Sequence, residues 1–82
     1  MSPEQMRMAR AALGWGVRDL AEKAGVTANT VTRIENGADA KRSTLDAIQA
    51  SFETAGIEFI PENGGGQGIR FRLRKDGTRE EH

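Results

Sequence analysis

The chain has 82 residues, 37% of them hydrophobic and 29% charged, with 12 basic side chains balanced by 12 acidic ones. It can therefore form one domain with a small core, and it cannot bind nucleic acid through bulk basic charge. The absence of cysteine excludes a disulfide framework, and no apolar run reaches the roughly 18 residues of a membrane span, so we expect a cytoplasmic protein without a membrane anchor.

The N-terminal segment predicts a helix over residues 3–13. Ser2 and Gln5 have the spacing of a capping box, in which each side chain accepts a hydrogen bond from the backbone N–H of the other. Pro3 suits the first helical position, where its missing N–H is not needed. Gly14 can adopt the left-handed conformation that ends a helix.

Two shorter helices follow, separated by a tight turn. The first covers residues 17–24, with its apolar side chains on one face, and ends at Gly25. Thr27 can cap the next helix, which ends at Asn36-Gly37. Two short helices joined by a glycine-centred turn are the arrangement of a helix-turn-helix.

A fourth helix follows a loop over residues 38–42. The stretch Ser43-Thr44-Leu45-Asp46 is a capping-box variant, so we expect the helix to begin there and Gly56 to end it. Its apolar side chains share one face: Leu45, Ile48, Phe52 and Ala55.

Beyond Gly56 the apolar pattern changes from helical to alternating, which predicts two short strands joined by a glycine-rich turn over 61–68. The alternating apolar residues are Ile57, Phe59, Ile69, Phe71 and Leu73. The predicted fold class is mainly α, with a four-helix helix-turn-helix domain over 1–56 and a short C-terminal β-hairpin over 57–74. Residues 75–82 are polar, and we expect a disordered tail.

The third helix contains four β-branched residues, which are mediocre helix formers: Thr30, Val31, Thr32 and Ile34. Packing Val31 and Ile34 inward directs another set of side chains outward. This set comprises Ala28, Asn29, Thr32, Arg33 and Asn36. A merely solvated helix would favour Glu, Lys and Ala, whereas amide, hydroxyl and guanidinium groups suit base edges and phosphates. The pattern therefore predicts a helix that contacts double-stranded DNA.

The segment RAALGWGVRDLAEKAGVTANTVTRIENG, Arg10–Gly37, resembles the lambda-repressor-like, Cro-type helix-turn-helix family, also called the xenobiotic-response-element family. The matching positions are Leu13-Gly14, Leu20-Ala21, Ala24-Gly25-Val26 and Ile34-Glu35-Asn36-Gly37. The resemblance implies that the third helix enters the major groove. It implies base-reading positions at Ala28, Asn29, Thr32 and Arg33, and phosphate contacts at Thr27, Asn36, Lys41 and Arg42.

The chain departs from the family pattern at two places. Val17 stands where members commonly have a phosphate-binding Gln, so that contact is weaker or shifts to Arg18. A strand pair replaces the usual fifth helix, so the dimer geometry of better-known members does not carry over. The resemblance also implies a partly buried ion pair of Arg10 with Glu35 between the first and third helices; the alternative is two exposed charges.

Other residues fit two interpretations. Trp15 is either a packed side chain between helices, which we favour, or part of the DNA surface. Arg70, Arg72 and Arg74 suit a solvated strand face or a second DNA contact. His82 stands at the chain end, where neither catalysis nor metal binding is expected.

The sequence predicts a DNA-binding transcriptional regulator. The five apolar hairpin residues need a cover, and we expect a second copy of the chain to provide it, giving a homodimer on a palindromic operator. The alternative is an antitoxin or other protein-interaction module, whose hairpin binds a protein partner. No triad, carboxylate pair or metal-ligand spacing is present, so we expect no enzyme activity, cofactor or metal.

Overall fold

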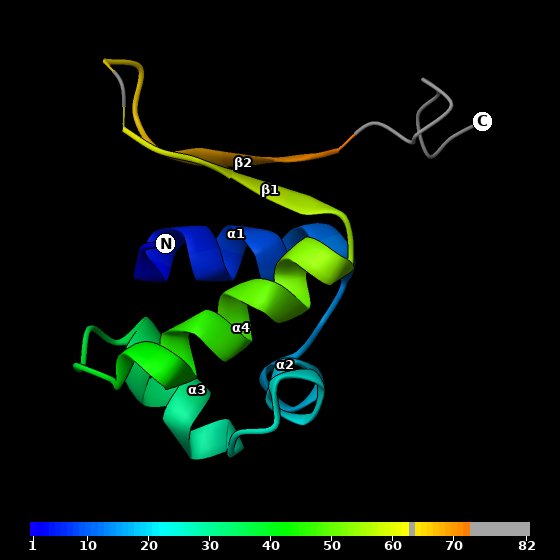
Figure 1. Ribbon diagram of the computed structural model, residues 1–82, viewed down its shortest axis with the longest axis vertical. Helices are drawn as coiled ribbons and strands as arrows, with labels where there is room; N and C mark the ends of the chain where they lie inside the picture. The colour runs from blue at the N-terminus through cyan, green and yellow to red at the C-terminus, as the bar shows by residue number, and fades with distance from the viewer. Residues whose placement is uncertain (63, 73–82) are drawn as a thin grey trace.

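The computed structural model describes residues 1–62 and 64–72, which form four helices and one antiparallel hairpin (Figure 1). The elements are α1 (Pro3–Leu13), α2 (Val17–Ala24), α3 (Ala28–Glu35), α4 (Arg42–Thr54), β1 (Ile57–Ile60) and β2 (Gly68–Phe71). This order confirms the predicted fold class. Leu73, Arg74 and the tail with His82 lie outside the described residues.

The first three helices begin and end at the predicted residues. The Ser2 hydroxyl accepts from the Gln5 N–H at 3.1 Å, and Gln5 Oε1 accepts from the Ser2 N–H at 2.9 Å. Gly14 and Gly25 have φ values of 71° and 73°, the left-handed conformation that glycine adopts without strain. Local hydrogen bonding and backbone sterics therefore determine these boundaries.

The predicted start of α4 is wrong. The helix begins at Arg42, and its N-cap Lys41 makes no side-chain cap hydrogen bond. The Leu45 N–H already donates to the Lys41 carbonyl at 3.0 Å, so Ser43 lies within the first helical turn and not in the extended N-cap conformation. Asp46 instead pairs with Arg42 at 3.3 Å, one turn away. The first-turn N–H groups of α4 thus have no side-chain cap.

The core takes side chains from all four helices and from β1. Its buried hydrophobic residues are Met6, Ala9, Leu20, Ala21, Val31, Ile34, Ile48, Phe52 and Ile57. Gly56, with φ 101°, turns the chain from α4 into β1, so the hairpin folds back over α1 and α4 (Figure 1). The hairpin is therefore part of the same hydrophobic core as the helices.

One residue of the predicted dimer interface, Ile57, lies in the core of the single chain. Ile57 is fully buried within a single chain and is unavailable to a partner. Phe59 and Ile69 also pack against the core, and the Phe59 ring meets Phe52 edge to face at 5.8 Å between centroids. Phe71 remains 36% exposed. The chain's own helices thus cover most of the apolar face that was assigned to a second copy.

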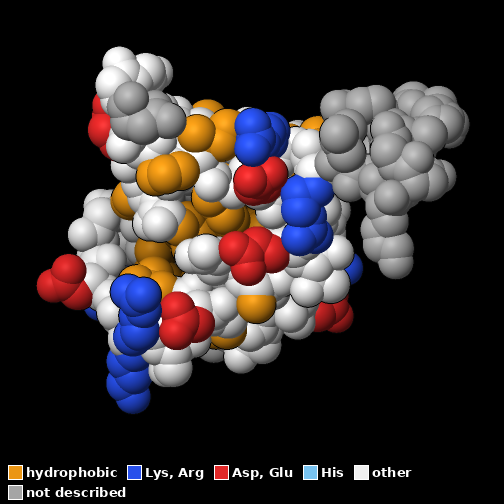
Figure 2. All heavy atoms as spheres, turned by 45° about the horizontal axis from the view of Figure 1, so that its top comes forward, with side chains coloured by type: hydrophobic (Ala, Val, Ile, Leu, Met, Phe, Trp, Pro, Cys, Tyr) orange, Lys and Arg blue, Asp and Glu red, His pale blue; other side chains and the backbone are white. Residues whose placement is uncertain are grey.

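The outer face of the hairpin is charged. The strands pair with Ile57 opposite Phe71 and Glu58 opposite Arg70. Arg70 Nε lies 3.0 Å from Glu58 Oε1, and this hydrogen bond lowers the pKa of Glu58. Acidic and basic side chains are interspersed over the hairpin and α4, and the described residues of this face form no single basic patch (Figure 2).

Gln5 has a second role that its capping position does not reveal. Its side-chain Nε2 donates to the Ile60 carbonyl at 3.0 Å and to the Gly68 carbonyl at 2.9 Å, and the residue is 3% exposed. These two residues face each other across the hairpin. One buried amide therefore joins α1 to both strands.

We predict that Gln5→Glu lowers the free energy of unfolding by about 1–3 kcal/mol at neutral pH, because a carboxylate would face two carbonyl oxygens without a donor. Burial would raise the folded-state pKa of the introduced group above its unfolded value, about 4.3. The loss of stability should therefore grow as the pH rises above that value. Urea unfolding between pH 4 and pH 8 measures it, with the exposed Gln67→Glu as control. Equal effects of the two substitutions would contradict the buried bridge.

Candidate nucleic-acid interface

The helix pair α2 and α3 lies at the end of the molecule opposite the hairpin (Figure 1). The two helices pack against each other across the turn at Gly25. Thr27 then caps α3, its Oγ1 accepting from the Thr30 N–H at 3.1 Å. A glycine turn and a threonine cap, both visible in the sequence, thus set the start of α3.

One side of α3 is buried and the other is polar and exposed. Val31 is fully buried and Ile34 is 6% exposed, so both belong to the core. Four of the polar residues predicted to face outward are exposed: Asn29, Thr32, Arg33 and Asn36. Ala28 is half-buried and packs against the core, so only part of its surface can meet a ligand.

A pocket of about 360 Å³ lies between the C-terminal half of α3 and the start of α4. Its lining residues are Thr30, Arg33, Ile34, Asp39, Ala40, Lys41 and Thr44. The structure therefore brings Arg33, a predicted base reader, beside Lys41, a predicted phosphate contact. The first turn of α4, which lacks a side-chain cap, begins at the same place, and uncapped helix N-termini favour anions.

The other predicted phosphate residues, Arg18, Thr27 and Arg42, are exposed on α2, at the α3 cap and at the start of α4. The Arg42–Asp46 pair is itself exposed, with side-chain fractions of 88% and 63%. Exposed pairs of this kind contribute little to stability, so Arg42 can exchange its partner for an incoming anion.

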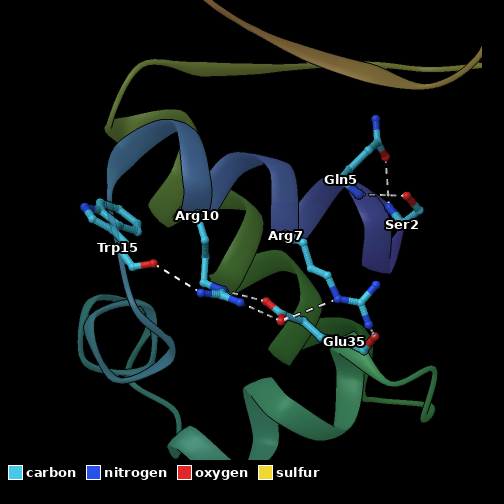
Figure 3. Close-up of polar contacts among 6 residues, drawn as sticks. All are labelled: Ser2, Gln5, Arg7, Arg10, Trp15 and Glu35. Carbon is cyan, nitrogen blue, oxygen red and sulfur yellow. Dashed lines mark hydrogen bonds and ion pairs between the residues drawn. The ribbon is translucent and has the colours of Figure 1, made fainter.

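A partly buried ion pair connects α3 to α1 (Figure 3). Arg10 donates through Nε to Glu35 Oε2 at 2.8 Å and through Nη2 to Oε1 at 2.9 Å. The Glu35 side chain is 7% exposed and that of Arg10 is 20% exposed. The hydrogen bond to Glu35 raises the pKa of Arg10. Arg10 Nη1 also donates to the Trp15 carbonyl at 3.2 Å, so one guanidinium joins α1, α3 and the turn before α2.

Arg7 also contacts the end of α3, and the sequence did not predict this contact. Its Nη2 donates to the backbone carbonyl of Glu35, and its Nε lies 4.0 Å from Glu35 Oε1 (Figure 3). Glu35 is the last residue of α3, where a cation is favourable to the helix dipole. The signal in the sequence was the spacing of Arg7 and Arg10, which are three residues apart and so share a side of α1.

Trp15 is packed in the structure. Its ring stacks on Phe52 at 5.6 Å between centroids with an interplanar angle of 18°, and the Lys23 ammonium lies 5.2 Å from the ring centroid. The indole therefore supports the α2–α4 contact at a partly buried position.

A comparison with protein families matches residues 4–54 to a family described as a helix-turn-helix domain. The matched segment contains nearly all of α1 and extends to the last residue of α4. A search of curated proteins finds no match. Within the described part of the chain, no helix is long and apolar enough to cross a membrane. Because the match covers more than half of the sequence and coincides with the four packed helices, the chain belongs to the helix-turn-helix domain family.

Proposed function

We propose that this protein is a sequence-specific, DNA-binding transcriptional regulator of the lambda-repressor-like type, acting in the cytoplasm without catalysis. The observation that carries the proposal is the exposed polar face of α3. Its side chains offer donors and acceptors suited to base edges, while the opposite side is fixed in the core and by the Arg10–Glu35 pair. Such a helix can hold its side chains steady against a groove.

The residues on the outer face of α3 differ in the bases that their chemistry suits. Arg33 suits the two acceptors of guanine in the major groove, and Asn29 suits adenine. Thr32 offers a hydroxyl and a methyl group, and the exposed part of Ala28 offers a methyl group for thymine. We assign Arg33 the largest share of base discrimination, because a guanidinium makes two parallel hydrogen bonds.

Phosphate contacts would flank this face. We assign them to Arg18, Thr27, Asn36, Lys41 and Arg42. Lys41 and the uncapped start of α4 lie beside Arg33 around one pocket, which places a phosphate contact next to a base contact. A single short helix gives little affinity, so we further propose a homodimer on a palindromic operator, with half-sites about 34 Å apart.

We predict that Arg33→Ala and Lys41→Ala weaken DNA binding in different ways. Arg33→Ala should cost about 1–3 kcal/mol on the selected operator and relax the base preference at one position. Lys41→Ala should weaken all sequences alike and reduce the slope of log K against log salt by about one. Selection of a binding site from random DNA, followed by titration at several salt concentrations, measures both.

The two variants serve as controls for each other, since both remove an exposed cation at the same pocket. Arg33→Ala and Lys41→Ala should unfold at the urea concentration of the native chain, because neither side chain is buried. If Arg33→Ala lost the same affinity for operator and for random DNA, this would contradict the assignment of Arg33 as a base-reading residue.

A further inference from the structure

The pattern of hydrogen-bonded pairs in the hairpin determines which backbone groups of β2 point away from β1. The Arg72 N–H donates to the Gly56 carbonyl at 2.8 Å. Bonded and non-bonded pairs alternate along an antiparallel ladder, so the backbone groups of Ile69 and Phe71 point away from β1. Within residues 1–62 and 64–72, no strand pairs with this edge.

The same strand also exposes a large apolar side chain, Phe71. β2 packs against α1, whereas β1 packs against α4. Among the described residues, the exposed large hydrophobic side chains are Met1, Met8 and Phe71, which belong to the start of the chain, to α1 and to β2. An unpaired strand edge beside apolar side chains is a template for another strand.

The charge on β2 does not oppose such pairing. Arg70, which lies between the two residues with outward backbone groups, is held by Glu58 of its own hairpin through contacts of 3.0 and 3.1 Å. Two β2 strands would therefore bring together two neutralised ion pairs instead of two bare cations.

The symmetry of antiparallel pairing suits the position of α3. Two identical strands that pair antiparallel are related by a two-fold axis perpendicular to their common sheet. The hairpin lies across one end of the long axis of the molecule, over α1 and α4, and α3 lies at the other end (Figure 1). Both helical layers would then lie on one side of a four-stranded sheet, and both copies of α3 would face the same way.

We propose that a second copy of this chain docks along the outer edge of β2, which no strand of the described residues occupies, pairing through the backbone groups of Ile69 and Phe71 and covering the exposed Phe71 ring. The proposal rests on the proposed function for its two-fold operator, and it moves the interface from the apolar face of the hairpin to its edge. The face itself offers a second copy less surface, because Ile57 is fully buried and Phe59 and Ile69 pack on the core.

Two other surfaces fit a second copy less well. The edge of β1 runs beside α4, where Ile57 is fully buried. An open pocket next to Trp15 and Lys23 is lined mainly by small α4 side chains such as Ala50 and Thr54, and it carries no strand edge. A dimer through that pocket is the competing outcome of the test.

Amide hydrogen exchange of the unmodified protein tests the proposal directly. If two β2 edges pair, the amides of Ile69 and Phe71 should become protected as the protein concentration rises through the dimer constant found by sedimentation. Rapid exchange of both amides under conditions where the protein sediments as a dimer would overturn the proposed edge. A chain that stays monomeric at the highest concentration would also overturn it.

A pair of matched substitutions provides a second measurement. Phe71→Lys places a charge on the proposed edge and should weaken dimerisation by about tenfold or more, as edge lysines do. Thr54→Lys places the same charge on the exposed face of α4 and should leave the dimer unchanged. The opposite result would assign the interface to the α4 pocket.

Failure of the edge and failure of the DNA-binding proposal are distinguishable. A single operator half-site, titrated at high protein concentration, reports on α3 alone. If Phe71→Lys binds this half-site like the native chain and loses affinity only on the full palindrome, both proposals stand. If the native chain prefers its half-site but does not dimerise through β2, only the edge assignment fails. If the protein dimerises through β2 but shows no sequence preference on DNA, the edge assignment stands and the DNA-binding proposal fails.

Discussion

Glu35→Ala is expected to lower the free energy of unfolding by about 3–5 kcal/mol, the range for removing one partner of a buried pair. The Glu35 side chain is 7% exposed and accepts two hydrogen bonds from Arg10. Its loss leaves a guanidinium between α1 and α3 without its counter-charge, and it also removes the carboxylate near Arg7. Urea denaturation followed by circular dichroism gives the midpoint and slope that this measurement needs.

The double variant Arg10→Met/Glu35→Leu should be much less destabilised than Glu35→Ala, because neither charge of the pair remains and only the Trp15 carbonyl loses a donor. The exposed pair of Arg42 and Asp46 is the internal control: Asp46→Ala should change stability little. Small, additive effects of the two single substitutions at Arg10 and Glu35 would show that the pair is solvated in solution.

Ile57→Ala should destabilise the domain by about 2–5 kcal/mol, as expected for a large-to-small change in a packed core. Ile57 is the first residue of β1 and is fully buried together with Phe52 of α4. The matched control is Phe71→Ala on the opposite strand, because Phe71 is the register partner of Ile57 and is 36% exposed. The unfolding of both variants should be measured at a protein concentration below the dimer dissociation constant, so that association does not contribute to the measured stability.

A large loss for Ile57→Ala and a small one for Phe71→Ala would show that the hairpin stabilises the monomer. If the hairpin were only an appended dimer element, both substitutions would leave the dilute protein equally stable. In that case Ile57→Ala would change the sedimentation behaviour instead. The same pair of variants therefore separates a core role from an association role.

Local chemistry let the sequence predict most of the secondary structure. Ser2, Gly14, Gly25 and Thr27 act on neighbours within a few residues, so their effects are readable without the fold. The alternation after Gly56 likewise predicted two strands that the structure contains. The predicted start of α4 was wrong because serine is a residue type that often caps helices, whereas the backbone at Ser43 is already helical.

The candidate interface was partly predictable for the same reason. The inward packing of Val31 and Ile34 determines the outward face of α3 by helical geometry alone. The nearness of Arg33 and Lys41 around one pocket depends on the course of the loop before α4, which no periodicity in the sequence specifies.

The tertiary structure alone decided what covers the hairpin and what holds α3. The sequence shows an apolar strand face but not which surface meets it, since the helices of the same chain and a second copy would satisfy the same pattern. Gln5 contacts Gly68 across 63 positions of sequence, and Arg7 reaches the end of α3 across 28. Contacts between elements so far apart depend on how the helices pack, and packing is a property of the whole core that no local segment encodes.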